Sequence, residues 1–292
     1  MYCINFIGNA SVPDALKALL VRLGEISRDY NAKLKNNSEL YFEDDSVPRT
    51  IISVYHNNGD LIINKSPEVL HMFKKLYITN EDFVDGHSPE EKMGLAAMYD
   101  YFQEFNINNL NLYTILKLHQ LLFSKCPFPE FGGGLRVENR YLPNSGVEIP
   151  NHDLVPQLIF DLLPKFNELL DLSATDSFNV FAYIDKAIAL YCDLLKIHPF
   201  PDGNGRTMRA FLNLLFMRVK LPPVYIDFDE RNVYGRTLNK AFVKGDFEPL
   251  NKFYYFKIYS SIMELGLISS FGSGLQNDAV EVDEDGVRLY RG

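Results

Sequence analysis

Hydrophobic residues recur at helical spacing along most of the chain from about residue 67 onwards. Three successive segments, PEVLHMFKKLYI, EEKMGLAAMYDYFQEF and LYTILKLHQLLF, each carry one apolar face. Residues 154–170 continue the pattern, and we expect the helix to bend or restart at Pro164, because proline disrupts a helix interior. Residues 12–35 also have leucines at helical spacing. The pattern therefore predicts a mainly α-helical fold.

Two further segments predict the buried centre of this fold. Residues 206–220 are apolar almost all round, which is typical of a buried helix. Residues 178–196 place apolar side chains at alternating steps of three and four, which predicts a core-facing helix. The members of that stripe are Phe181, Ile184, Ile188, Tyr191 and Leu195.

Strand-like sequence interrupts the helices in two places. Residues 49–64 have two β-branched runs around Asn58-Gly59, the strongest short-range signal for a β-hairpin. Residues 137–149 have strand-like ends around a Pro-Asn-Ser-Gly turn. The tail beyond Ser269 allows either a small hairpin at Asp285-Gly286 or a loose acidic extension. We therefore expect one hairpin at 137–149 and a small N-terminal α+β extension.

Composition and charge exclude several classes of function. The 292 residues include 38 acidic and 29 basic side chains, so the net charge is −9, and 47% are hydrophobic. We expect no membrane span and no secretory signal, because the chain has no run of about 18 apolar residues and no basic leader with a cleavage site. An acidic chain without a Lys/Arg stripe is poorly suited to nucleic acid. Cys3, Cys126 and Cys192 share no metal-ligand spacing, which favours free thiols and a cytoplasmic location.

The segment HPFPDGNGRTMR, between the two buried helices, carries most of the candidate chemistry. Gly203 and Gly205 leave backbone N–H groups unshielded where the loop runs into a helix, which predicts a phosphate site. Arg206 and Arg209 lie three apart on one helix face and can make bidentate contacts with phosphate oxygens. Asp202 supplies the hard carboxylate that suits a phosphate-bound Mg²⁺.

His198 ends the preceding helix beside this loop. Its ordinary pKa of about 6.5 suits the imidazole to accept a proton from a hydroxyl near neutral pH. We expect Phe200 to point inward and anchor the loop. A lone histidine at a helix end is more often structural, and so is a Gly-Asn-Gly turn. Folding alone, however, does not require two arginines facing a glycine loop.

The segment resembles the signature of the Fic family, H-x-F-x-[DE]-G-N-G-R-x-x-R, at every defined position. The similarity covers about residues 87–258. GHSPEEKMGLAAMYDYF and LYTILKLHQLLF resemble the opening helices, GGGLRVENRYLPNSGVEIP resembles the β-hairpin called the flap, and RNVYGRTLNKAFVKGDFEPLNKF resembles the closing helices. The resemblance implies a mainly α, Fic-type helical bundle with a β-hairpin flap.

The resemblance also implies an activity, the transfer of AMP from ATP·Mg²⁺ to a Tyr, Thr or Ser hydroxyl of a target protein. His198 is then the general base, and Asp202 holds Mg²⁺. The backbone N–H groups of Gly203, Asn204 and Gly205 would then bind the α- and β-phosphates. Arg206 would bind the β- and γ-phosphates, and Arg209 the γ-phosphate. Family branches that phosphorylate or transfer phosphocholine have Lys at the position of Gly205 or Ala at that of Gly203, and neither change occurs here.

The flap, residues 137–149, would dock the target protein by strand addition, with a plain surface hairpin as the alternative. Many Fic enzymes also carry an inhibitory S/T-x-x-x-E-G/N helix whose glutamate pairs with the second signature arginine, here Arg209. Residues 53–57 have this spacing with Asn in place of Glu, and Ser260–Glu264 are followed by Leu instead of Gly or Asn. The sequence therefore predicts weak inhibition at most.

These observations predict an N-terminal region at 1–86, a Fic core at 87–258, and a helix end with an acidic tail at 259–292. The leading function is a protein adenylyltransferase that uses ATP and Mg²⁺. The alternatives are an enzyme that removes AMP from proteins and a non-catalytic nucleotide-binding or interaction module. The oligomeric state stays open, with a homo-oligomer among the alternatives.

Overall fold

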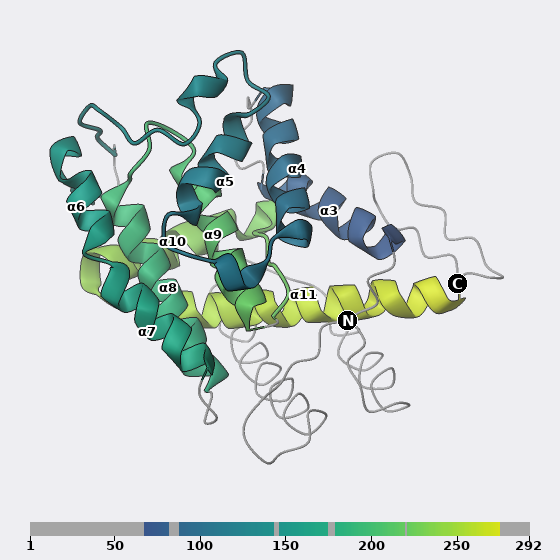
Figure 1. Ribbon diagram of the computed structural model, residues 1–292. Helices are drawn as coiled ribbons and strands as arrows, with labels where there is room; N and C mark the ends of the chain where they lie inside the picture. The colour runs from purple at the N-terminus through teal and green to yellow at the C-terminus, as the bar shows by residue number, and fades with distance from the viewer. Residues whose placement is uncertain (1–66, 82–87, 143–145, 175–178, 220, 275–292) are drawn as a thin grey trace.

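The computed structural model describes residues 67–81, 88–142, 146–174, 179–219 and 221–274 (Figure 1). Within these ranges the chain forms helices and connecting loops, and none of the described residues lies in a β-strand. The mainly α prediction is therefore confirmed. The helix predicted at 12–35, the hairpin at 49–64 and the tail hairpin all lie outside the described residues.

The α-helices are α3 (Pro67–Glu81), α4 (Pro89–Glu104), α5 (Thr114–Phe123), α6 (Val155–Phe160), α7 (Leu163–Ala174), α8 (Val180–Ile197), α9 (Asn204–Arg218), α10 (Arg231–Lys244) and α11 (Glu248–Gly274). Short 3₁₀ turns lie between them: η1 (Ile107–Asn109), η2 (Pro129–Phe131), η3 (His152–Leu154) and η4 (Phe228–Glu230). The break near Pro164 is confirmed, because α7 begins one residue before that proline.

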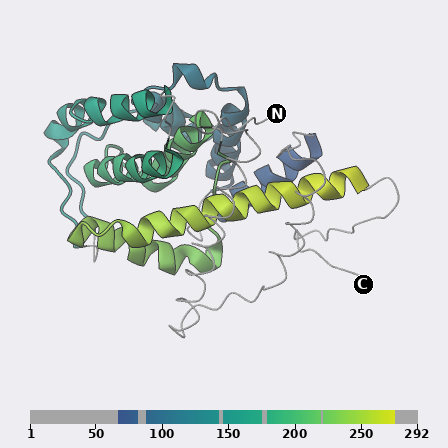
Figure 2. The ribbon, with the colours of Figure 1, turned by 90° about the horizontal axis from the view of Figure 1, so that it is seen from below.

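Helices α8 and α9 form the centre of the bundle, as the apolar pattern predicts. The α8 stripe is buried at Ile184, Ile188, Tyr191 and Leu195, while Phe181 at its N-terminal end is half-buried. Figure 2 shows α8 between α7 on one side and α10 with α11 on the other. A helix that is apolar all round, like α9, is stable only when neighbours cover it on every side, and α8 and α5 pack directly against α9.

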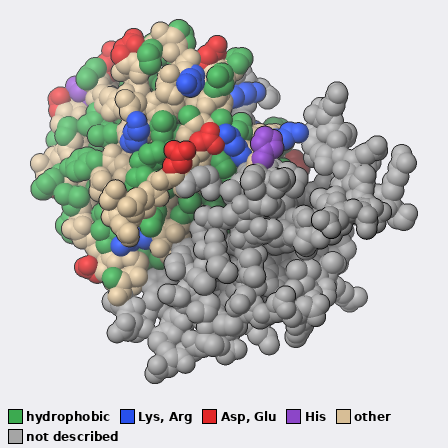
Figure 3. All heavy atoms as spheres, turned by 45° about the vertical axis from the view of Figure 1, so that its right-hand side comes forward, with side chains coloured by type: hydrophobic (Ala, Val, Ile, Leu, Met, Phe, Trp, Pro, Cys, Tyr) green, Lys and Arg blue, Asp and Glu red, His purple; other side chains and the backbone are tan. Residues whose placement is uncertain are grey.

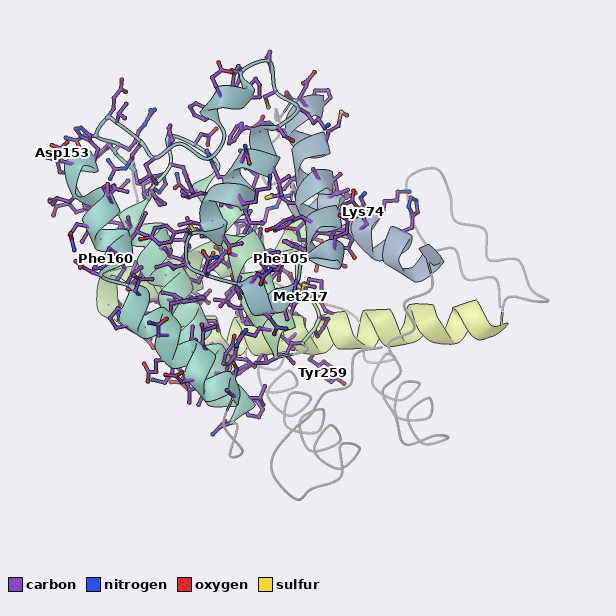
Figure 4. All side chains as sticks on the ribbon, viewed as in Figure 1. Lys74, Phe105, Asp153, Phe160, Met217 and Tyr259 are labelled. Carbon is purple, nitrogen blue, oxygen red and sulfur yellow. The ribbon has the colours of Figure 1, made fainter. Side chains whose placement is uncertain are left out.

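The N-terminus of α4 is fixed by a capping box. The Ser88 side chain accepts a hydrogen bond from the Glu91 N–H, and the Glu91 carboxylate accepts one from the Ser88 N–H. Lys74 on α3 donates to Asp100 on α4 at 2.7 Å, and Figure 4 shows Lys74 on the side of α3 nearest α4. The capping box is important for the site, because it fixes the place of the Glu91 carboxylate.

A buried ion cluster joins α11 to the turn before α10. The ammonium of Lys257 lies 2.6 Å from Asp227 and 2.7 Å from Glu230. Burial raises the pKa of Glu230 to about 7 even though the charge of Lys257 acts in the opposite direction. The cluster thus belongs to the helical framework and not to the signature loop.

No helix within the described residues is long and apolar enough to cross a membrane.

The predicted flap does not form a hairpin in the described part of the segment. Residues 137–142 and 146–149 are extended loop without strand pairing, so the hairpin prediction is wrong for them. Val137 and Tyr141 are 80% and 83% exposed. An isolated pair of strands needs a covered apolar face to be stable in water, and these side chains cover none.

Candidate active site

The signature loop, defined as residues 198–205, connects the end of α8 to the start of α9. Both of its ends turn through the left-handed backbone region. His198 caps α8 with φ 51°, and Gly203 caps α9 with φ 71°. His198 is the one non-glycine residue with positive φ among the described residues. A strained conformation at a non-glycine residue persists only where the surrounding structure holds it, and such residues cluster at functional sites.

Asn204 holds the loop closed through its side chain. Its Oδ1 accepts from the Phe200 N–H at 2.9 Å, and its Nδ2 donates to the Phe200 carbonyl at 2.8 Å. Both residues are buried, and the Phe200 ring points into the core as predicted. Gly203 admits no side chain, because a Cβ there would lie 2.7 Å from Leu122 Cδ2 and 2.9 Å from Phe123 Cε2.

The start of α9 presents backbone donors for which the described residues provide no acceptor. Among the described residues no side chain caps this helix, and its intrahelical bonds begin with the Thr207 N–H, which donates to the Gly203 carbonyl at 3.0 Å. The N–H groups of Asn204, Gly205 and Arg206 therefore remain for an external acceptor. Together with the positive end of the helix dipole they make a candidate anion site.

The Gly203 N–H has a different partner in this conformation. It donates to Oδ1 of Asp202 at 2.6 Å, while the Asp202 side chain stays 69% exposed at the mouth of the loop. This carboxylate must turn outward before the Gly203 N–H can bind a phosphate. The described residues contain no group of three or more acidic, histidine or cysteine side chains suited to a metal. A single exposed carboxylate fits Mg²⁺ that a nucleotide brings with its own phosphate oxygens.

The two arginines of the signature lie in different surroundings. Arg206 is 5% exposed, and its Nη1 donates to the Glu91 carboxylate at 3.0 Å. Its Nη2 lies 3.9 Å from Asp202. The guanidinium therefore joins the capping box of α4 to the mouth of the loop.

Arg209 packs under the loop, one turn further along α9. It lies so close to Gly205 that a Cβ on that glycine would be 3.1 Å from Nη1 of Arg209. Its guanidinium also hydrogen-bonds the hydroxyl of Tyr234 on α10, which in turn pairs with the hydroxyl of Tyr191 on α8. The loop thus has a positive charge beneath it as well as beside it.

His198 is mostly buried beside this anion site. Burial lowers the pKa of its imidazole below the usual 6.5, and the nearby charge of Arg136 lowers it further. A hydrogen bond between the ring and the backbone of Leu195 acts in the opposite direction. The imidazole is therefore neutral at pH 7, as a general base must be before it accepts a proton.

Arg136 ties the end of α8 to the flap segment, a role that the spacing of residues along the sequence does not predict. Its Nε donates to the His198 carbonyl at 2.8 Å, and its Nη1 donates to the Glu138 carbonyl at 3.0 Å. Nη2 donates to the Pro150 carbonyl. One buried guanidinium thus brings the two ends of the flap segment to the backbone of the candidate base.

The structure also brings in two residues that sequence reasoning did not assign to the site. Glu91 has a visible signal as part of a Ser-x-x-Glu capping box, but its pairing with a residue 115 positions away has none. His119 is buried in the core with both ring nitrogens bonded. One of those bonds, however, goes to the signature loop.

Part of the chain, including the signature loop, is similar to a known protein family. Residues 109–216 match the sequence profile of the Fic/DOC family. The match contains α8, the whole signature loop and all but the last two residues of α9. Residues 109–216 are therefore similar to a Fic domain. The family resemblance read from the sequence is therefore confirmed.

Two curated proteins that are similar to this chain are both named protein adenylyltransferase Fic. One, from Nematostella vectensis, is 38% identical over 101 residues, which cover 35% of this chain and 23% of the relative. The other, from Drosophila mojavensis, is 33% identical over 175 residues, which cover 58% of this chain and 33% of the relative. The alignment thus spans about a quarter to a third of the length of these relatives.

Solved structures support the fold alone. Residues 134–508 of Fic-1 from C. elegans superpose with a TM-score of 0.53 at 20% identity, covering 88% of this chain and 73% of that one. A Fic domain containing signaling protein from Bacteroides thetaiotaomicron gives a TM-score of 0.54 at 15% identity, covering 86% and 97%. The helical bundle is therefore that of Fic proteins.

Proposed function

We propose that this protein is an adenylyltransferase that moves AMP from ATP to a hydroxyl of a target protein. The observation that carries the proposal is the uncapped start of α9, where three N–H groups and the helix dipole meet two buried arginines beside a neutral histidine. Nucleotidyl transfer depends mainly on positioning and charge stabilisation, and these are the groups present. The name shared by the curated relatives supports the same activity.

The transfer needs one proton movement and one displacement at phosphorus. His198 accepts the proton of the target hydroxyl as its oxygen bonds to the α-phosphorus. The bond from that phosphorus to the bridging oxygen breaks, and pyrophosphate leaves with the bonding electrons. The N–H groups of Gly203, Asn204 and Gly205 and the guanidinium groups of Arg206 and Arg209 hold the phosphates. Asp202 would hold the Mg²⁺ that neutralises the charge of the triphosphate.

The target protein is proposed to dock on the flap segment, as an added strand along residues 137–149. A cavity of about 320 Å³ opens beside Pro201 in the signature loop. Its other lining residues lie between 130 and 140, and three of them, Val137, Glu138 and Arg140, belong to the flap segment. The exposed Val137 lines this cavity, so an extended target segment could place a side chain next to Pro201 of the signature loop. We further propose that residues 87–258 are the unit that carries out the reaction.

Charge on the described surface supports protein rather than polyanion targets. On the face in Figure 3 the Lys and Arg side chains of the described residues lie as separate spots among apolar and acidic ones. The chain as a whole carries a net charge of −9. Such a surface provides few sites for the counterion release that drives binding to nucleic acid.

Labelled ATP tests the proposed function. Label from α-labelled ATP should appear on protein with wild type and disappear with His198→Ala. His198→Asn is the matched control for the backbone, because Asn adopts the left-handed conformation more readily than Ala does. Both variants should lose label while still binding nucleotide. Label from γ-labelled ATP instead would indicate a kinase, and nucleotide binding without any label would indicate a binding module.

A further inference from the structure

His119 on α5 connects two loops that are far apart in sequence. Its side chain is 0% exposed. Its Nε2 lies 3.0 Å from the Asp202 carbonyl in the signature loop, and its Nδ1 lies 2.8 Å from the Gly133 N–H, just after η2. The ring therefore bridges the signature loop and the glycine-rich turn that leads into the flap segment.

The two partners fix one tautomer of this ring. A backbone N–H can only donate, so Nδ1 carries no proton and accepts from Gly133. A carbonyl can only accept, so Nε2 carries the proton and donates to Asp202. Burial lowers the pKa of His119 to about 4, which agrees with a ring that is neutral at physiological pH.

The ring is also fixed by packing. It stacks on Phe200 with a centroid separation of 3.9 Å and an interplanar angle of 3°, and the Phe123 ring lies 4.9 Å away. Phe200 belongs to the signature loop and is itself held by Asn204. His119 thus holds the loop through a side chain and through a backbone carbonyl at the same time.

The peptide group that His119 binds lies directly before the start of α9. It joins Asp202 to Gly203, and its own N–H donates to the Asp202 carboxylate. Rotation of this peptide would turn the Gly203 N–H away from the anion site and shift the Asp202 side chain. The Asp202 side chain is largely exposed, so its position depends on the backbone that carries it.

From this geometry we propose that His119 is a positioning residue for AMP transfer. Its Nε2–H sets the orientation of the peptide between Asp202 and Gly203. The hydrogen bond from the Gly133 N–H to Nδ1 fixes the tautomer in which Nε2 carries this proton. The inference rests on the function proposed above, but it adds a residue outside the signature and without contact to the reacting atoms.

Two substitutions separate the two bonds of the ring. His119→Gln can keep a donor near the position of Nε2 and loses the acceptor for Gly133. His119→Asn can keep an acceptor near the position of Nδ1 and loses the donor to Asp202. Each removes one hydrogen bond and the same aromatic ring, so a purely structural role predicts similar losses in both.

Kinetics and amide hydrogen exchange of the full chain are then measured for both variants. We expect His119→Asn to lower kcat about 10- to 100-fold with the KM for ATP changed less than about threefold, and His119→Gln to stay within about threefold of wild type. In exchange experiments, protection should fall at residues 199–205 in His119→Asn and at Gly133 in His119→Gln. Equal losses in both variants, or any other ranking, would overturn the proposal.

Two further readouts keep the inference independent of activity and of variant stability. If wild type transfers no AMP, the proposed function fails, while the exchange pattern still decides whether His119 orients the loop. If the variants do not fold, ¹⁵N chemical shifts of His119 in the wild-type protein show which ring nitrogen carries the proton. The proposal requires a protonated Nε2 and an unprotonated Nδ1 at neutral pH, and the opposite tautomer contradicts it.

Discussion

The signature loop and the flap segment lie side by side but are built in opposite ways. The loop is closed by Asn204, anchored by Phe200, and bonded from outside by His119 and Arg136. The flap segment is bonded through Arg136 and through the bond from the His152 N–H to Asn139 at 2.9 Å, and Val137 and Tyr141 within it are exposed. The proposed chemistry thus lies on a fixed frame, and the proposed target contacts lie on an exposed segment that can change without disturbing that frame.

The same contrast is visible in the surfaces around the two regions. The flap segment leads into η3 and α6, where Figure 4 shows Asp153 and Phe160 at the outer end of the bundle. Phe160 is 56% exposed and Leu154 is 52% exposed. The signature loop instead lies next to α5, which buries six of its ten residues, and α9, which buries twelve of fifteen. Substitutions should therefore affect stability in the loop and target choice in the flap segment.

The largest effect is expected at Asn204. Replacing it with Ala leaves the buried N–H and carbonyl of Phe200 without partners, which should lower the free energy of unfolding by about 2 kcal/mol or more. AMP transfer should fall with it, because the loop no longer closes. Urea unfolding measures the first effect and labelled ATP the second. A variant with unchanged unfolding would contradict the role given to this side chain.

A smaller effect, limited to the target, is expected in the flap segment. Replacing the exposed Val137 and Tyr141 with Ser should lower modification of a target protein about tenfold, since exposed apolar side chains are typical interface anchors. Stability and ATP affinity should remain those of wild type, because neither side chain packs in the core. Calorimetry with ATP provides the control, and a loss of ATP affinity would show that the two regions are not separate.

The pairing of Glu91 with Arg206 should have a moderate effect. Glu91→Gln keeps an oxygen acceptor for the capping box but removes the charge opposite Arg206. A charge-assisted bond is about twice as strong as a neutral one, so we expect about a fivefold rise in the KM for ATP. Glu90→Gln, one residue earlier on the same turn, is the matched control. Faster transfer in Glu91→Gln would instead mean that Glu91 competes with the triphosphate.

The smallest effect is expected from pH. AMP transfer requires neutral His198, whose pKa is lowered below 6.5 by burial and by Arg136. The rate should therefore rise with pH through a value below 6.5 and change less than about twofold between pH 6.5 and 8. A pH–rate profile of kcat checks this. An acid limb centred above pH 7 would show that a different group is the base.

The sequence predicts the helical fold and the signature loop well, because both depend on local pattern. The α8 stripe, the restart near Pro164 and the inward-facing Phe200 follow from spacing and residue type. The supporting contacts of Glu91, His119 and Arg136 could not be read in this way, since each joins residues distant in sequence. The flap hairpin was predicted from strand-like ends, but the described residues of that segment form no strand, because strand-like residues alone do not make a stable isolated pair of strands. The roles of the signature residues stay predictions.

The most direct test of the account is a crystal structure with Mg²⁺ and a non-hydrolysable ATP analogue. We predict the phosphates on the N–H groups at the start of α9, with Arg206 and Arg209 bound to them and the α-phosphorus facing the His198 ring. The Asp202 carboxylate should have turned from the Gly203 N–H toward the metal. A nucleotide bound elsewhere, or a loop that still keeps the bond between Asp202 and Gly203 with no phosphate beside it, would contradict the central claim.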